Sequence, residues 1–125
     1  MSKNVVIIDD DPIHCFILKK YFEELDVEDA KTFPNGKEAL EYFKSITLEE
    51  YPDVIFLDLK MPVMGGFEML RIFEEEYWSQ SLKLDLIVLT TSLRKEDRML
   101  SNSFQSVTDY VTKPVTIEKL KEIVL

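Results

Sequence analysis

The stretch VVIIDDDP, residues 5–12, joins four apolar residues directly to three aspartates and a proline. Runs of β-branched residues that do not alternate with polar ones are typical of strands buried on both faces of a parallel sheet. Two later runs have the same character, VIFL at residues 54–57 and LIVL at residues 86–89. The sequence therefore predicts three inner strands of a parallel sheet, the first of which ends in an acidic cluster.

Segments with helical periodicity separate these strands, and two more mixed segments, residues 28–33 and 107–111, are predicted to be edge strands. The predicted helices cover residues 12–25, 36–46, 67–77, 95–104 and 116–125. Five consecutive βα units with right-handed crossovers predict an α/β fold. Its five-stranded, doubly wound parallel sheet would have the order 2-1-3-4-5.

The first two predicted helices have clear start signals. Asp11 precedes Pro12, a residue favoured in the first helical turn, so Asp11 is predicted to be an N-cap, and Asn35 is predicted to cap the next helix. The predicted buried face of the first helix comprises His14, Ile17, Leu18, Tyr21, Phe22 and Leu25. His14 is therefore interpreted as a partly buried helix residue, and Cys15, which has no basic group nearby, as an unreactive thiol.

The composition of the 125 residues, 46% apolar and 31% charged, is that of one globular domain. Acidic residues outnumber basic ones by 24 to 15, and the net charge of −9 argues against direct binding of nucleic acid or anionic membranes. The one cysteine permits no internal disulfide, and no apolar run approaches the roughly 20 residues of a membrane span. Because a strand begins almost at the N-terminus, leaving no room for a signal peptide, the expected location is cytoplasmic.

Polar side chains follow the predicted strands at their carboxyl ends. Asp9 and Asp10 follow the first strand, Asp58 follows the third, Thr90 closes the fourth, and Lys113 comes after the fifth. Ligands of such sheets bind at this edge, where the strand order reverses between strands one and three. Three carboxylates in one crevice require a cation. Oxygen ligands without histidine or thiolate favour Mg²⁺, with Mn²⁺ and Ca²⁺ as alternatives.

The ammonium of Lys113 and the hydroxyl of Thr90 extend this acidic cluster into a possible phosphoryl-transfer site. A lysine is suited to a phosphate oxygen, and such sites depend mainly on positioning and charge neutralisation. No side chain has the character of a strong independent base. An aspartate can itself act as the nucleophile and form an acyl phosphate.

Four motifs in this order and spacing, VVIIDD, VIFLDLKMPVMGG, LIVLTTS and DYVTKP, resemble the receiver domain of response regulators in two-component signalling. The resemblance covers essentially the whole chain and implies the flavodoxin-like, CheY-like form of the predicted fold. It implies that Asp58 is the phosphoacceptor and that Asp10 is a direct ligand of Mg²⁺. Asp58 also contributes to the metal site, Asp9 binds the metal directly or through water, and the backbone carbonyl of Lys60 is a further ligand.

The resemblance also assigns roles to the last two motifs. Thr90 and Lys113 bind the phosphoryl group, and the Lys113–Pro114 peptide is expected to be cis, as is common for X-Pro in tight turns. Tyr110 is implied to be a switch residue that turns inward when phosphorylation draws Thr90 toward the phosphoryl group. The alternative for Tyr110 is an exposed tyrosine on an edge strand.

Together these expectations describe residues 1–125 as a single receiver domain without an effector domain, a signalling protein rather than an enzyme. It would accept a phosphoryl group from a sensor histidine kinase or a histidine phosphotransfer protein and switch the binding of a downstream protein. The usual output surface of the family would lie on residues 95–104 and 116–125. Ile13 and Phe16 lie off the main apolar stripe, and a docking patch for the phosphodonor and ordinary core packing are equally open for them.

Three other functions are weighed against the receiver. A phosphatase of the haloacid-dehalogenase type would use Asp9 as nucleophile in a D-x-D motif with Asp11, but an acidic pair after Lys113 and a cap domain are missing from the pattern. A flavin carrier of the same fold would need a Ser/Thr/Gly-rich phosphate loop after the first strand, and DDDP has the wrong charge. A receiver that binds partners without phosphorylation is the third alternative.

Overall fold

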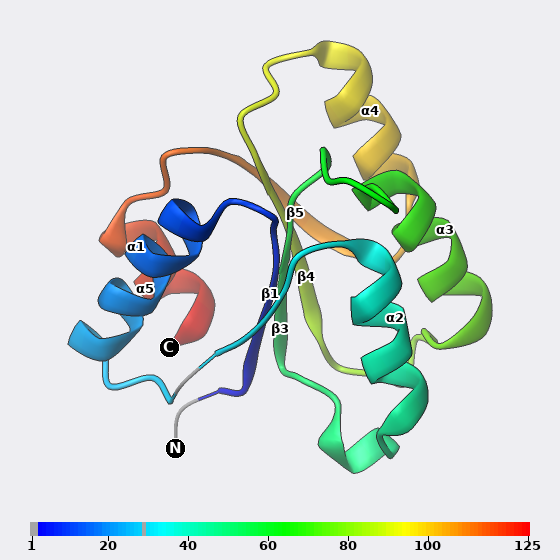
Figure 1. Ribbon diagram of the computed structural model, residues 1–125, viewed down its shortest axis with the longest axis horizontal. Coiled ribbons are helices and arrows are strands. Elements are labelled where there is room, and N and C mark those ends of the chain that lie inside the picture. The colour runs from blue at the N-terminus through cyan, green and yellow to red at the C-terminus, as the bar shows by residue number, and fades with distance from the viewer. Residues whose placement is uncertain (1–2, 29) are drawn as a thin grey trace.

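Five parallel strands form one sheet in the order β2-β1-β3-β4-β5, which confirms the predicted topology (Figure 1). The structure is a computed structural model that describes residues 3–28 and 30–125. The strands are β1 (Val5–Ile8), β2 (Lys31–Phe33), β3 (Val54–Leu57), β4 (Asp85–Thr90) and β5 (Val107–Thr112). The helices are α1 (Pro12–Glu24), α2 (Gly36–Ser45), α3 (Gly66–Glu76), α4 (Lys95–Ser103) and α5 (Ile117–Val124), with a short 3-10 helix η1 (Leu48–Glu50) before β3.

The two edge strands differ from their predicted bounds. β2 begins at Lys31 rather than at residue 28, and the predicted segment includes Asp29, which lies outside the described residues. Its pairing with β1 starts at Val6 opposite Lys31, whereas Ala30 just before the strand is buried against the core. β5 extends one residue further than predicted because Thr112 pairs with the last residue of β4.

Helices cover both faces of the sheet, with α1 and α5 on one side and α2, α3 and α4 on the other (Figure 1). Alternate residues of each inner strand point to opposite faces, so each strand contributes to two apolar clusters. In β1, Val5 and Ile7 pack with α1 and α5, whereas Val6 and Ile8 pack with α2 and α3. The unalternating apolar runs of the sequence are thus explained by burial on both faces.

The start of α1 agrees with its sequence signal, and its buried face is narrower than expected. The Asp11 carboxylate accepts hydrogen bonds from the backbone N–H groups of Ile13 and His14 and caps the helix. His14, Leu18 and Phe22, spaced four residues apart, form the buried row. The prediction that Ile17 belongs to this face is wrong, because Ile17 lies off this row and is 41% exposed.

The loop between β3 and α3 approaches the backbone of the third strand closely. A Cβ atom at Gly66 would lie 2.5 Å from the Asp58 carbonyl oxygen and 2.9 Å from Leu59 Cα, so only glycine fits there. Val63, in the same loop, has a positive φ of 67°. The loop therefore turns tightly after Asp58 and keeps that residue at the sheet edge.

Two further observations complete the fold. The Lys113–Pro114 peptide is cis, as the sequence analysis expects. Within residues 3–28 and 30–125, every helix is too short or too polar to cross a lipid bilayer.

Candidate functional site

The three predicted acidic residues meet at the carboxyl end of the sheet. Carboxylate oxygens of Asp9, Asp10 and Asp58 all lie within 4.8 Å of one another. Backbone hydrogen bonds fix the two loops that carry them, since Asp58 N–H donates to the Ile8 carbonyl and Asp9 N–H donates to the Phe33 carbonyl, both at 2.9 Å. The parallel pairing of β1 with β3 therefore brings together residues that are 49 positions apart in the sequence.

Lys113 reaches this cluster from the loop after β5. Its ammonium nitrogen lies 2.9 Å from Asp9 Oδ2 and 3.1 Å from Asp58 Oδ2, and all three side chains are almost buried. The backbone N–H of Lys113 donates to the Thr90 carbonyl at 2.8 Å, which ties the lysine to the end of β4. The ammonium thus bridges two of the three carboxylates.

Burial and this bridge set the protonation of the site. Burial opposes ionisation of Asp9, but hydrogen bonds from His14 and Lys113 outweigh it and lower the pKa of Asp9 from 3.8 to about 2. Burial raises the pKa of Asp58, and the Lys113 ammonium acts in the opposite direction. The desolvation of Lys113 is outweighed by its two carboxylate partners, so the pKa of Lys113 is raised and the side chain stays charged.

The phosphoacceptor candidate, Asp58, is held by two donors. Its Oδ1 accepts a hydrogen bond from the Leu59 N–H at 2.8 Å, and its Oδ2 faces the ammonium of Lys113. Thr90 is buried at the end of β4, and its hydroxyl oxygen accepts a hydrogen bond from the Ser92 N–H at 3.3 Å. Asp58 is fixed in orientation, whereas among the described residues the Thr90 hydroxyl is hydrogen-bonded only within its own loop.

The residues present fit a hard divalent cation. The donor set consists of carboxylate oxygens alone, Asp10 is exposed at the mouth of the cluster, and Asp9 and Asp58 lie behind it. Among the residues that the structure describes, these three carboxyl groups face one ammonium, so a second cation would be favourable here. Lys60, whose backbone carbonyl is expected to be a ligand, follows two residues after Asp58 and is exposed.

His14 contacts the site directly, which the sequence did not predict. Its Nδ1 lies 2.8 Å from Asp9 Oδ2, the same oxygen that Lys113 contacts, and both residues are buried. The sequence contained a weak signal for this contact, because a residue three positions after an N-cap lies in the first helical turn, close to the strand end. The interpretation of His14 as a partly buried helix residue near the site is correct, but it did not include the contact with Asp9.

Tyr110 of β5 is 7% exposed, with its ring turned inward. Its hydroxyl donates to the Ser92 carbonyl at 3.0 Å, and the Arg98 guanidinium of α4 lies 4.7 Å from the ring centroid. The alternative of an exposed edge tyrosine does not describe this structure. The contacts with Ser92 and Arg98, which the sequence did not reveal, connect the ring to the loop that follows Thr90.

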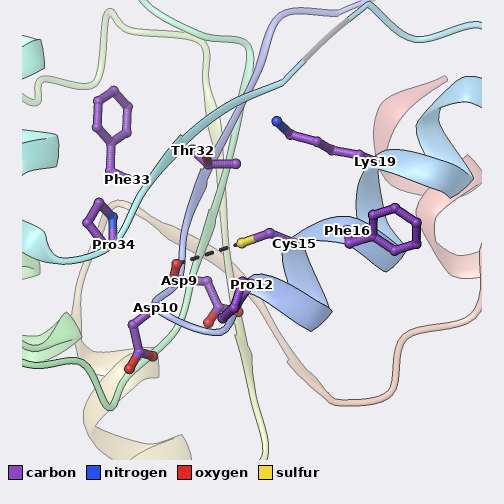
Figure 2. Close-up of a pocket in the computed structure, with 9 residues that line it drawn as sticks. All are labelled: Asp9, Asp10, Pro12, Cys15, Phe16, Lys19, Thr32, Phe33 and Pro34. Carbon is purple, nitrogen blue, oxygen red and sulfur yellow. Dashed lines mark hydrogen bonds between the residues drawn. The ribbon is translucent and has the colours of Figure 1, made fainter.

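A groove of about 450 Å³ includes part of the acidic cluster and lies between α1 and the end of β2 (Figure 2). Its lining comprises Asp9, Asp10, Pro12, Cys15, Phe16, Lys19, Thr32, Phe33 and Pro34. Figure 2 shows Cys15 directed toward the Asp9 carbonyl, at an Sγ–O distance of 3.7 Å. Burial, together with the nearby carboxylates of Asp9 and Asp11, raises the pKa of Cys15 to about 11, in agreement with an unreactive thiol.

The two apolar residues off the main stripe of α1 lie on the surface. Ile13 is 70% exposed and Phe16 is 60% exposed. The alternative that these side chains pack in the core is therefore wrong. A docking patch beside the acidic cluster stays a prediction.

Comparison with known proteins gives a consistent result. Residues 5–125 match the family model described as the response regulator receiver domain. The chemotaxis protein CheY of Halobacterium salinarum is 30% identical over 114 residues, which cover 91% of this chain and 87% of that protein. Hybrid signal transduction histidine kinase L of Dictyostelium discoideum is 31% identical over 122 residues, 96% of this chain but 7% of the kinase.

A solved structure agrees with these relatives. The crystal structure of a two-component response regulator from Cytophaga hutchinsonii superimposes with a TM-score of 0.82 at 25% identity, covering 96% of this chain and 92% of that chain. The chain spans less than half of the length of several curated relatives that it matches.

Proposed function

Because the chain belongs to the response regulator receiver family of two-component signalling, we propose that Asp58 accepts a phosphoryl group from a phosphohistidine donor. The observation that carries this proposal is the Lys113 ammonium, which bridges the Oδ2 atoms of Asp9 and Asp58 beside an exposed third carboxylate. This arrangement provides an oriented nucleophile, an ammonium beside it and an opening for a second cation. Residues 1–125 would act as one receiver domain.

Receiver domains bind Mg²⁺ at an acidic pocket, and the cluster of Asp9, Asp10 and Asp58 corresponds to that pocket. We expect these carboxylates and the Lys60 carbonyl to hold Mg²⁺, with Mn²⁺ and Ca²⁺ as alternatives. When bound, the ion neutralises charge that builds up on the transferred phosphoryl oxygens. The exposed position of Asp10 supports entry of the ion from solvent.

The residues of the chain perform the transfer itself. A carboxylate oxygen of Asp58 attacks phosphorus, the P–N bond of the phosphohistidine breaks, and its electron pair returns to the imidazole nitrogen of the donor. The Leu59 N–H keeps the Asp58 carboxylate in one orientation during this attack. Lys113, already at 3.1 Å from Asp58 Oδ2, then pairs with a phosphoryl oxygen, and the Thr90 hydroxyl donates to another.

The partners follow from the same chemistry. The donor would be a sensor histidine kinase or a histidine phosphotransfer protein, and the similarity to a segment of a hybrid histidine kinase supports this class. The exposed Ile13 and Phe16 of α1, beside the cluster, would contribute to the donor contact. The output would be altered binding of a downstream protein at the surface formed by α4 and α5.

The proposed switch connects Thr90 to that surface through Ser92. When the Thr90 hydroxyl turns toward a phosphoryl oxygen, it loses its hydrogen bond with the Ser92 N–H. The carbonyl of the same residue, Ser92, accepts a hydrogen bond from the Tyr110 hydroxyl. A shift of this loop therefore changes the environment of the Tyr110 ring. Beryllofluoride, an acyl-phosphate mimic, should shift the ring signals of Tyr110 in NMR spectra; unchanged signals would exclude a role of Tyr110 in the switch.

Intact-mass spectrometry after incubation with acetyl phosphate and Mg²⁺ tests the proposed function. The wild type should gain one phosphoryl group, and the gain should disappear without the metal and in Asp58→Asn. An adduct that persists in Asp58→Asn and is lost in Asp9→Asn would instead indicate Asp9 as the nucleophile. A folded, Mg²⁺-binding wild type that gains no phosphoryl group from acetyl phosphate or from a phosphohistidine protein would favour binding without phosphorylation.

A further inference from the structure

We propose that His14 is a positioning residue for Asp9: it holds the Asp9 carboxylate in the orientation in which it serves the metal site. This inference rests on the proposed function, because it assigns a second layer of contacts to the same acidic cluster. It goes beyond that function by giving a role to a residue that neither contacts the phosphoryl group nor binds the cation.

Three donors from different parts of the fold fix the Asp9 carboxylate. His14 Nδ1 lies 2.8 Å from Oδ2, Lys113 Nζ lies 2.9 Å from the same oxygen, and the Asp11 N–H donates to Oδ1 at 3.0 Å. His14 is 8% exposed and Asp9 is 6% exposed, so water contributes little to this arrangement. The direction of the carboxylate plane is therefore set by protein groups.

The contact with Asp9 indicates that Nδ1 of the His14 ring carries a proton. An ionised carboxylate can only accept hydrogen bonds, so the Nδ1 atom that faces Asp9 must be the N–H donor. His14 Nε2 is buried and has no hydrogen-bond partner among the residues that the structure describes. The contact with Asp9 therefore places an N–H on Nδ1.

The importance of His14 follows from the second task of Lys113. In the proposed reaction the ammonium turns from Asp9 toward a phosphoryl oxygen, and Oδ2 then loses one of its two donors. His14 is fixed by the first turn of α1 and by the Asp11 cap, so its contact with Oδ2 does not depend on the state of the site. We infer that His14 keeps Asp9 oriented while Lys113 moves.

Replacement of His14 tests this role through Mg²⁺ binding, measured by isothermal titration calorimetry. His14→Leu places an apolar side chain of similar size at this position and removes the donor. It should weaken Mg²⁺ binding by about 10-fold or more, as the loss of a residue that hydrogen-bonds to a metal ligand commonly does. His14→Asn places an amide N–H where Nδ1 lies and should restore most of the affinity. Phe22→Leu is the matched control, because it loosens the packing of α1 on the Phe56 ring without reaching the site.

The tautomer gives a second readout that a purely structural role would not require. His14 is the one histidine of the chain, so the ¹⁵N signals of its ring are unambiguous. The wild type should show a proton on Nδ1, and Asp9→Ala should leave that nitrogen protonated in only part of the molecules. A wild-type ring whose Nδ1 carries no proton would contradict the proposal.

The possible results distinguish a failure of the proposed metal site from a failure of the proposed role of His14. A wild type that binds no Mg²⁺ would overturn the proposed metal site, and the role of His14 with it. A wild type that binds Mg²⁺ while His14→Leu binds it equally well would overturn only the role of His14. A loss of affinity in Phe22→Leu as large as in His14→Leu, or no recovery in His14→Asn, would assign the effect to the packing of α1 instead.

Discussion

Replacing Lys113 by methionine should destabilise the metal-free protein strongly. The ammonium lies 2.9 Å from Asp9 Oδ2 and 3.1 Å from Asp58 Oδ2, so each pair has a Coulomb energy of about 5.5 kcal/mol at an effective dielectric constant of about 20. Much of this attraction offsets the desolvation of the charges, and removing one partner of a buried pair typically costs about 3–5 kcal/mol. All three side chains keep some exposure, so we expect a loss of about 3 kcal/mol in the free energy of unfolding.

Saturating Mg²⁺ should reduce this loss, because a bound cation would supply the positive charge that the variant lacks. Urea unfolding of the wild type and of Lys113→Met, each in EDTA and in MgCl₂, measures both effects. The gap between the two proteins should narrow to less than about half when the metal is present. Lys37→Met, which removes an exposed lysine at the start of α2, is the control and should change stability by no more than about 0.5 kcal/mol.

Two results would refute this reasoning. A loss smaller than about 1 kcal/mol in EDTA would mean that the ammonium does not compensate the carboxylates. An equal loss in EDTA and in MgCl₂ would mean that lysine and cation do not neutralise the same charges. A second comparison sharpens the test. In Asp58→Asn a neutral amide replaces one of the two carboxylates, so Lys113→Met should lower the free energy of unfolding by less than it does in the wild type.

Three other predictions concern stability. Gly66→Ala should lower the free energy of unfolding by about 2 kcal/mol in urea titrations, because the added Cβ would meet the Asp58 carbonyl at 2.5 Å; an unchanged midpoint would contradict the close approach. Val63→Gly should raise it by about 0.5 kcal/mol, since Val63 is 77% exposed and relief of its positive φ exceeds the entropic cost of glycine; destabilisation would refute the strain. The pKa of Asp9, about 2, lies below the unfolded value, so its stabilising contribution is present above pH about 4 and is lost as the pH falls toward 2. Acid titrations should therefore show a smaller loss of stability in Asp9→Asn than in the wild type, and parallel curves would contradict the lowered pKa.

The sequence contained most of the fold because its local and global signals agree. The unalternating strands required burial on both faces, and the order of βα units left few topologies. The Asp11 and Asn35 caps identified two helix starts correctly, since capping depends on residues close in sequence. Ile17 was misplaced because helical periodicity alone does not say how wide the buried stripe is.

The functional site was predictable in part, for a physical reason. The carboxyl ends of parallel strands share one edge, so the meeting of Asp9, Asp10 and Asp58 follows from topology. The contact between His14 and Asp9 depends on the rotation of α1 about its axis and on one rotamer, which no sequence pattern specifies. The stacking of Arg98 on Tyr110 likewise depends on how α4 is seated on the sheet.

The order of the strands also bears on how the chain is made. β1 lies next to the centre of the sheet, yet it is synthesised before the other four strands, and its partner β3 begins 49 residues later. Until β3 is synthesised, the edge of β1 that pairs with β3 has no hydrogen-bond partners in the sheet. An unpaired edge of an apolar strand is prone to association with other chains. The ion pair of Asp9 with Lys113 forms later still, because Lys113 follows Asp9 by 104 residues. An acidic cluster that formed before Lys113 is synthesised would lack its own ammonium, and free cations of the surrounding solution would be its counterions.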